Sequence, residues 1–168
     1  MSSLKILKSY PLSENDIKSV EKTNIFKLDD IVKLNHIDEC LDRLGRCIFL
    51  IQNINENTGH WSSLIVYDNI CEIYEGYGLN KNQLIKLDKD MYKLFILIKN
   101  SGYKLILNNH KRQELSPYIN TCGRYALIRI MLYQKNLKQF NNFLSILETK
   151  NYNIDDLISI LTFLFLGK

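Results

Sequence analysis

The sequence predicts an α+β fold in which a central mixed β-sheet is flanked by helices. Short apolar runs typical of strands occur four times between residues 47 and 107, and longer segments with apolar residues at helical spacing stand between and after them. The 168 residues, 46% hydrophobic and 24% charged, are enough for one substantial core. We therefore expect a single domain over residues 1–168.

The N-terminal part should contain two helices before the first strand. Ser13 can cap a short helix, because an acid follows it three residues later. A longer helix is predicted over residues 29–44, with Gly45 as its C-terminal cap. A buried strand at 47–52 and a polar loop at 53–59 follow. The apolar stripe of the longer helix comprises Ile31, Val32, Leu34, Ile37, Leu41 and Leu44.

A β-hairpin is predicted next, with strands that begin at His60 and end at Glu75. Asp68 and Asn69 form its two-residue turn. In an antiparallel pair with this turn, the numbers of facing residues sum to about 137, so His60 should face Tyr77. This register brings an imidazole and a carboxylate to the same edge of the sheet.

The chain after the hairpin should contribute one more strand and several helices. A helix over residues 80–100 leads to a strand at 103–107. The apolar run at 125–133 fits a buried helix, although periodicity alone does not exclude a buried strand. Asn120 or Thr121 can cap the start of that helix.

Two further helices are predicted at residues 137–148 and 153–166. Asn153 can cap the last helix, and Asp155 and Asp156 bring negative charge to its first turn, where the helix dipole favours it. This helix is apolar on nearly all sides. We therefore expect it to be buried or to cover a sheet, with a partner-binding surface as the alternative.

Charge and composition argue against several classes of protein. The net charge of +4, from 22 basic and 18 acidic residues, is no nucleic-acid signature. The basic residues near the predicted site are expected to form a solvated edge; they are Lys111, Arg112, Arg124 and Arg129. Four cysteines without a CxxC pair argue against a zinc ribbon or a redox motif, and neither a metal nor another cofactor is expected. The sequence shows no signal-peptide pattern and no apolar run long enough to span a bilayer, so we expect a protein that is neither secreted nor membrane-spanning.

Cys122, His60 and Glu75 together provide the residue types of a thiol protease. Cys122 would stand in the first turn of a helix, where free N–H groups and the helix dipole favour the thiolate. A histidine base and a carboxylate that orients it complete such a site. Gln113 can donate to an oxyanion together with the backbone N–H of Cys122, and Gly123 lets a substrate backbone approach closely. Each residue alone is more often structural, and only the combination supports the hypothesis.

The order of these residues resembles the adenain and SUMO-specific protease superfamily, over residues 46–133. The resemblance implies an adenain-like fold with the nucleophile at a helix N-terminus. It implies that Cys122 is the nucleophile, His60 the general base and Glu75 the orienting acid. Gln113 would be an oxyanion donor, and Trp61 would shape the substrate site. The matching motifs are Thr58-Gly59-His60-Trp61, Tyr74-Glu75-Gly76-Tyr77-Gly78 and, after Gln113, Asn120-Thr121-Cys122-Gly123-Arg124-Tyr125.

Two features depart from the pattern of the superfamily. Gln113 precedes Cys122 by nine residues, a longer interval than the superfamily has, and a proline lies within it. Asn109 or Asn120 could therefore share the oxyanion role. Gly76 replaces the usual small polar residue after the acid, which we expect to be tolerated.

The resemblance implies a cysteine endopeptidase that cleaves after small residues, at sites such as Gly-Gly-X. The compact chain is most similar to viral maturation proteases, which implies a viral structural precursor as substrate. The expected location is a virion or the cytoplasm or nucleus of a host cell. A ubiquitin or ubiquitin-like deconjugating enzyme is the alternative within the same chemistry.

Two alternatives lie outside protease chemistry: a catalytically dead binding module and a nucleic-acid-binding protein. Some viral members of the superfamily use DNA or a peptide as an activator, and the modest basic charge permits such a partner. No membrane partner is expected.

Overall fold

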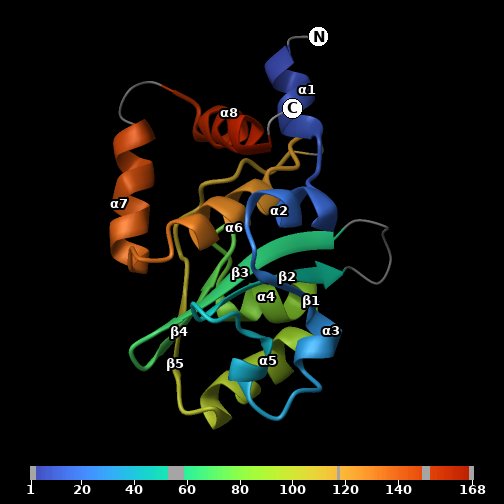
Figure 1. Ribbon diagram of the computed structural model, residues 1–168, viewed down its shortest axis with the longest axis vertical. Coiled ribbons are helices and arrows are strands. Elements are labelled where there is room, and N and C mark those ends of the chain that lie inside the picture. Colours follow the sequence, from blue (N-terminus) through green and yellow to red (C-terminus); the bar gives the residue numbers. More distant parts are fainter. Residues whose placement is uncertain (1–2, 53–58, 117, 149–151, 167–168) are drawn as a thin grey trace.

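The sheet lies at the centre of the computed structural model, which describes residues 3–52, 59–116, 118–148 and 152–166. Its strand order is β1-β2-β3-β4-β5; the two outer pairs are parallel and the two inner pairs antiparallel (Figure 1). The α+β class with a mixed central sheet is thus confirmed. The strands are β1 (Asn24–Lys27), β2 (Arg46–Gln52), β3 (Gly59–Tyr67), β4 (Ile70–Tyr74) and β5 (Lys104–Leu107).

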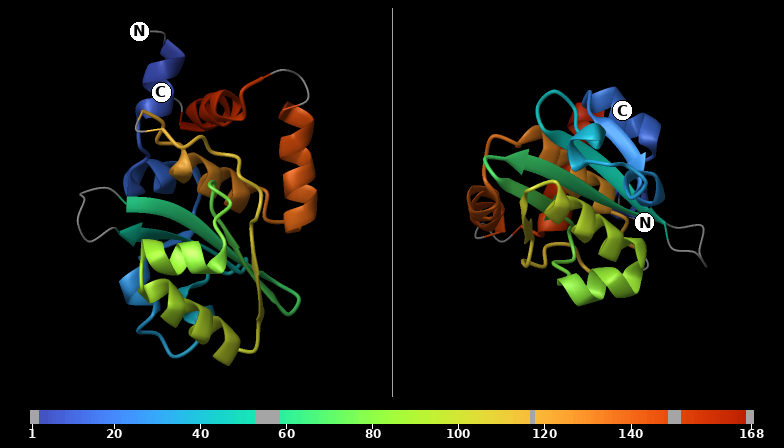
Figure 2. Two further views of the ribbon diagram at one scale, coloured as in Figure 1. Left: turned by 180° about the vertical axis from the view of Figure 1, so that it is seen from behind. Right: turned by 90° about the horizontal axis from the view of Figure 1, so that it is seen from below.

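Helices cover both faces of this sheet (Figures 1 and 2). On one face α3, α4 and α5 pack against it, on the other α2 and α6, and α7 and α8 pack against α6. The helices are α1 (Ser3–Ser9), α2 (Glu14–Val20), α3 (Leu28–Ile31), the 3-10 helix η1 (Ile37–Cys40), α4 (Lys81–Leu87), α5 (Asp90–Asn100), α6 (Cys122–Met131), α7 (Leu137–Glu148) and α8 (Ile154–Leu166).

Strand β2 is apolar from Cys47 to Ile51 because both of its faces are buried there. Cys47, Phe49 and Ile51 point into the core on the α5 side, and Ile48 points into the core on the α6 side. A strand in the middle of a covered sheet requires apolar residues in succession rather than in alternation. The two cores therefore hold the β2–β3 region, from which the candidate site is built, in a fixed place.

The single helix predicted over residues 29–44 is wrong. The chain leaves helical conformation after Ile31, and η1 follows as a separate short turn. The carboxylate of Glu39 accepts the backbone N–H of His36 at 2.8 Å, which fixes this turn locally and competes with a continuous helix. Most of the predicted stripe still packs into or against the core, but Leu44 is 40% exposed.

Several other elements differ from the prediction in part. The helix predicted at 80–100 is two helices, since the Asp88 carboxylate accepts the N–H of Asp90 and starts α5 anew. Gly45 has a positive φ of 74°, but it closes a turn in which its N–H donates to the Asp42 carbonyl, not a helix. Strand β1 and helix α1 were not predicted. Residues 53–58 of the predicted polar loop lie outside the described residues.

The hairpin and the last helices follow the prediction closely. Ser63 pairs with Tyr74 and Tyr67 with Ile70, so the predicted register is confirmed. Ser13 caps α2 in a capping box, and α7 has the predicted bounds. Helix α8 is buried only on one side, because Phe163, Leu164 and Phe165 are 39–68% exposed. No helix within the described ranges is long and apolar enough to cross a membrane.

Candidate active site

Three elements bring His60, Glu75 and Cys122 together. His60 is the second residue of β3, Glu75 directly follows β4, and Cys122 is the first residue of α6. The hairpin register places the imidazole and the carboxylate at one sheet edge, where His60 Nε2 lies 3.3 Å from Glu75 Oε2. The predicted meeting of these two groups and the helix-start position of Cys122 are therefore both observed.

The Glu75 carboxylate is held in place by the turn that follows it. Its Oε2 accepts the backbone N–H of Tyr77 at 2.8 Å, and its Oε1 accepts that of Leu79. The side chain is only 2% exposed. The His60 Nε2–H is not aligned well enough for a hydrogen bond, so the contact between the two side chains is an ion pair. A carboxylate with fixed orientation is suited to hold an imidazole in one position.

The electrostatics of the pair favour a thiolate and an imidazolium. Burial alone would raise the pKa of the Cys122 thiol, but the hydrogen bond and charge of His60, with backbone N–H groups of Trp61 and Gly123, lower that pKa below 9.0. Burial alone would lower the pKa of His60, yet Cys122 and Glu75 outweigh it and raise that pKa from 6.5 to about 9. A lowered thiol pKa and a raised imidazole pKa both favour the charged forms of the two groups.

The remaining cysteines lie in a different environment. Cys40, Cys47 and Cys71 are fully buried in the core on the α5 side, whereas Cys122 is half-buried. The hydrogen bond with Cys40 and burial raise the pKa of Cys47, and burial raises that of Cys71. A buried thiol with a raised pKa is a poor nucleophile, so Cys122 is the cysteine suited to react.

Tyr77 connects the imidazole to Gln113. Its ring stacks on that of His60 with centroids 5.0 Å apart, as the hairpin register predicts for facing residues. Its hydroxyl accepts a hydrogen bond from Gln113 Nε2 at 3.1 Å. Burial, followed by the charges of Cys122 and Glu75, raises the pKa of Tyr77 to about 12. Sequence reasoning placed Tyr77 opposite His60 but assigned it no part in the site.

Gln113 is buried next to the turn that holds the acid. It is 1% exposed, and its backbone N–H donates to the Gly76 carbonyl at 2.8 Å. A Cβ on residue 76 would lie 2.9 Å from Gln113 Oε1, so glycine at this position allows Gln113 to approach. The two other residues considered for the oxyanion role are engaged or placed elsewhere: Asn120 donates its amide to the Ser9 carbonyl at 2.8 Å, and Asn109 lines a different cavity.

Trp61 and Gly123 pack against each other below the N-terminal segment. A Cβ on Gly123 would lie 3.0 Å from Trp61 Cδ1 and 3.1 Å from Leu12 Cβ. Gly123 therefore permits the close approach of Trp61 from the same chain. The indole N–H of Trp61 donates to the Leu12 carbonyl at 3.0 Å, which fixes the ring beside Cys122.

The segment before α2 surrounds the start of α6 with backbone carbonyls. The N–H of Asn120 donates to the Lys8 carbonyl at 2.8 Å, and the guanidinium of Arg124 donates to the Leu7 carbonyl at 3.0 Å. Sequence reasoning found no chemistry in the first 28 residues. Carbonyl acceptors are present at every residue, so no side-chain pattern could have revealed this role.

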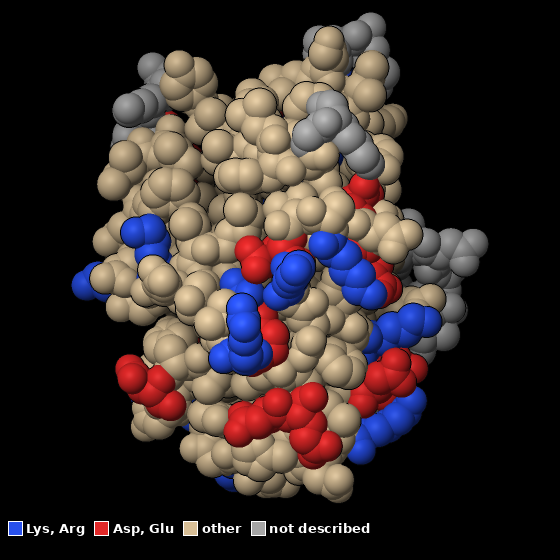
Figure 3. All heavy atoms as spheres, in the orientation of Figure 1, with Lys and Arg blue, Asp and Glu red and all other residues tan. Residues whose placement is uncertain are grey.

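Two arginines expected at a solvated edge are buried instead. Arg124 and Arg129 are both fully buried. Arg129 forms a two-point ion pair with Glu72 on β4, at 2.7 and 2.9 Å, and so anchors α6 to the sheet. On the face shown in Figure 3, basic and acidic side chains of the described residues are interspersed and form no large basic area.

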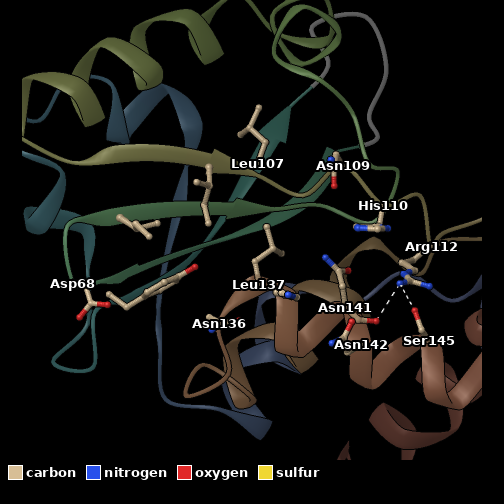
Figure 4. Close-up of a pocket in the computed structure, with 14 residues that line it drawn as sticks. Asp68, Leu107, Asn109, His110, Arg112, Asn136, Leu137, Asn141, Asn142 and Ser145 are labelled. Atoms are coloured by element: carbon tan, nitrogen blue, oxygen red, sulfur yellow. Dashed lines mark hydrogen bonds between the residues drawn. The ribbon is translucent and has the colours of Figure 1, made fainter.

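A cavity of about 590 Å³ is formed between the end of the hairpin, β5 and α7 (Figure 4). Arg112 points from its rim toward α7, where it donates to the Asn141 carbonyl and the Ser145 hydroxyl. Apart from Asn109, this cavity involves none of the predicted site residues. Within the described residues, no cluster of three or more His, Cys, Asp or Glu is placed to hold a metal ion.

Comparison with known proteins identifies a viral relative. The chain is 28% identical over 155 residues to uncharacterized protein V9 of the Sputnik virophage, and the match covers 85% of this chain and 88% of that protein. The central domain of the uncharacterized Lpg1148 protein from Legionella pneumophila has a similar structure, with a TM-score of 0.45 and 11% identity over 92% of this chain and 98% of that one. No protein-family model matches the sequence.

Proposed function

We propose that the protein is a cysteine endopeptidase with an adenain-like fold, belonging to the adenain and SUMO-specific protease superfamily. The observation that carries the proposal is the pairing of the half-buried Cys122 thiol with His60, whose imidazole lies 3.3 Å from the Glu75 carboxylate. This pairing favours the thiolate, which is the form that attacks a carbonyl carbon.

In the proposed reaction, the Cys122 thiolate attacks the carbonyl carbon of the scissile bond, and the C=O electron pair moves to the oxygen. Backbone N–H groups at the start of α6 and the Gln113 amide stabilise this oxyanion. Collapse of the intermediate breaks the C–N bond, and the leaving amine takes the proton of the His60 imidazolium. Neutral His60 then accepts a proton from water, the resulting hydroxide attacks the thioester, and the Cys122 thiolate leaves.

The proposed substrate is a viral structural precursor that is cut after small residues, as the resemblance implies. The virophage relative supports a viral setting, although that relative has no described activity.

Mass-spectrometric mapping of electrophilic probes tests this proposal. Wild-type protein, Cys122→Ala and the core variant Cys40→Ala are incubated with a Gly-Gly peptide probe and with ubiquitin and ubiquitin-like probes. We expect the peptide probe to modify Cys122 in the wild type and in Cys40→Ala. Reaction only with the ubiquitin-type probes would establish the deconjugating alternative. A protein that no probe labels, and whose Cys122→Ala variant retains a bound precursor, would be a binding module.

A further inference from the structure

Asp155 is a buried carboxylate that accepts hydrogen bonds from two residues of a loop distant in the sequence. It lies in the first turn of α8 and is 1% exposed. Its Oδ1 accepts the hydroxyl of Thr121 at 2.6 Å, and its Oδ2 accepts the backbone N–H of Glu114 at 3.0 Å. A carboxylate that only complements the dipole of its own helix needs no partners of this kind.

These two donors stand at the two ends of the loop between Gln113 and the candidate nucleophile. Glu114 directly follows Gln113, and Thr121 directly precedes the first residue of α6. Thr121 occupies the predicted N-cap position, but its hydroxyl makes no capping hydrogen bond and donates to the Asp155 carboxylate instead. The Thr121 carbonyl accepts the backbone N–H groups of Arg124 and Tyr125, so its position sets the first turn of α6.

We propose that Asp155 is a positioning residue, whose carboxylate holds the Gln113 amide and the Cys122 thiol in a fixed relation by joining the two ends of the loop between them. Its effect on catalysis rests on the proposed function. The nine-residue interval is longer than the resemblance implies, and a longer loop has more conformational freedom to lose. The buried Asp155 carboxylate binds one donor at each end of this loop, and it thereby restricts the loop next to Gln113 and next to Cys122.

Asp156 provides a matched control for Asp155. Both residues lie in the first turn of α8 and carry the same charge. The Asp156 carboxylate, however, is 27% exposed and forms an ion pair with Lys8 at 2.7 Å. Any effect that comes only from charge at the start of α8 should therefore appear in Asp156→Asn as well.

The kinetic test compares Asp155→Ala, Asp155→Asn and Asp156→Asn on a Gly-Gly peptide substrate. Asp155→Ala should lower kcat by about 10- to 100-fold with KM within about threefold, because an oxyanion donor displaced by roughly 1 Å stabilises the transition state less. Alkylation of Cys122 by iodoacetamide needs no oxyanion donor and should change by less than about threefold. Asp155→Asn should recover most of the turnover, since its amide can accept from Glu114 and donate to the Thr121 oxygen.

Hydrogen exchange tests, independently of turnover, whether the Asp155 carboxylate joins the two ends of the loop. In Asp155→Ala the amide of Glu114 and the first turn of α6 should exchange faster than in wild type and in Asp156→Asn. Three results would each overturn the proposal. The first is unchanged exchange at these amides, and the second is an unchanged kcat. The third is an equal fall of turnover and alkylation caused by global unfolding. If the wild type cleaves no peptide while the exchange pattern appears as expected, the proposed function is wrong, but the role of Asp155 in joining the two ends of the loop is confirmed.

Discussion

Replacing His60 with alanine should turn Cys122 from a reactive thiolate into an ordinary buried thiol. In the structure, burial raises the pKa of this thiol, and His60 supplies the largest of the effects that lower it from 9.0. Without the imidazole, the effect of burial remains and the pKa of the thiol should rise, so that a smaller fraction of the thiol is ionised at pH 7. Alkylation of Cys122 at pH 7 should therefore fall by about tenfold or more.

The assay is the rate of iodoacetamide labelling at each cysteine, measured by mass spectrometry of peptides between pH 5 and 10. The three core cysteines serve as internal controls, because their burial should keep them unlabelled in every folded variant. His110→Ala provides a matched control, since His110 lines the cavity near α7 and not the site. It should label at Cys122 like the wild type.

Two results would refute this reasoning. One is a His60→Ala protein that labels at Cys122 as fast as the wild type at pH 7. The other is a wild-type protein whose Cys122 labels only as the pH rises above the usual range for a free thiol. Either result would mean that no thiolate–imidazolium pair forms, and the proposed protease mechanism would lose its nucleophile.

Three further predictions follow from the same contacts. Peptidase turnover should fall as the pH rises through about 9, because His60 then loses the proton that the leaving amine needs. Alkylation of Cys122 should not fall over this range, and parallel pH profiles of the two rates check this. Tyr77→Phe keeps the ring stacked on His60 and loses only the hydrogen bond to Gln113, so kcat should fall by less than about tenfold. Tyr77→Ala also removes the ring and should lower kcat further. Equal effects of the two substitutions on kcat would exclude a role for stacking. Glu72→Ala leaves Arg129 buried and unpaired, which should lower the free energy of unfolding in urea by about 3–5 kcal/mol, whereas Glu72→Ala combined with Arg129→Met should lower it less.

The meeting of His60 and Glu75 could be predicted because a two-residue turn fixes the register of a hairpin. Once Asp68 and Asn69 were placed at the turn, the facing pairs from Tyr67–Ile70 to Ser63–Tyr74 followed, and beyond the end of this ladder Tyr77 stacks on His60. The position of Cys122 could be predicted for a similar local reason. A polar loop before a strongly apolar run marks a helix start, and Cys122 lies at that boundary.

Residues 29–44 show where such local reasoning fails. Their apolar spacing is helical, yet of the predicted stripe only Ile31 and Ile37 are buried within the short helix α3 and the 3-10 turn η1, and most of its other apolar side chains pack against the core from irregular backbone. Burial requires only that apolar side chains reach the core, and irregular backbone meets this requirement when polar side chains such as Glu39 satisfy its N–H groups. A periodic pattern therefore predicts which residues are buried more reliably than it predicts the helix that carries them.

The contacts that hold the candidate site together leave even less trace in the sequence. Asp155 has the sequence context of an ordinary acid in the first turn of a helix, and only the fold shows that its donors come from the loop before Cys122. The N-terminal segment contributes through carbonyls of residues such as Lys8 and Leu12, which any side chain at those positions would leave in place. The reacting groups of such a site need particular side chains, whereas part of what positions them is backbone, which no residue type marks. The sequence therefore indicates the candidate reacting groups before it shows what holds them in position.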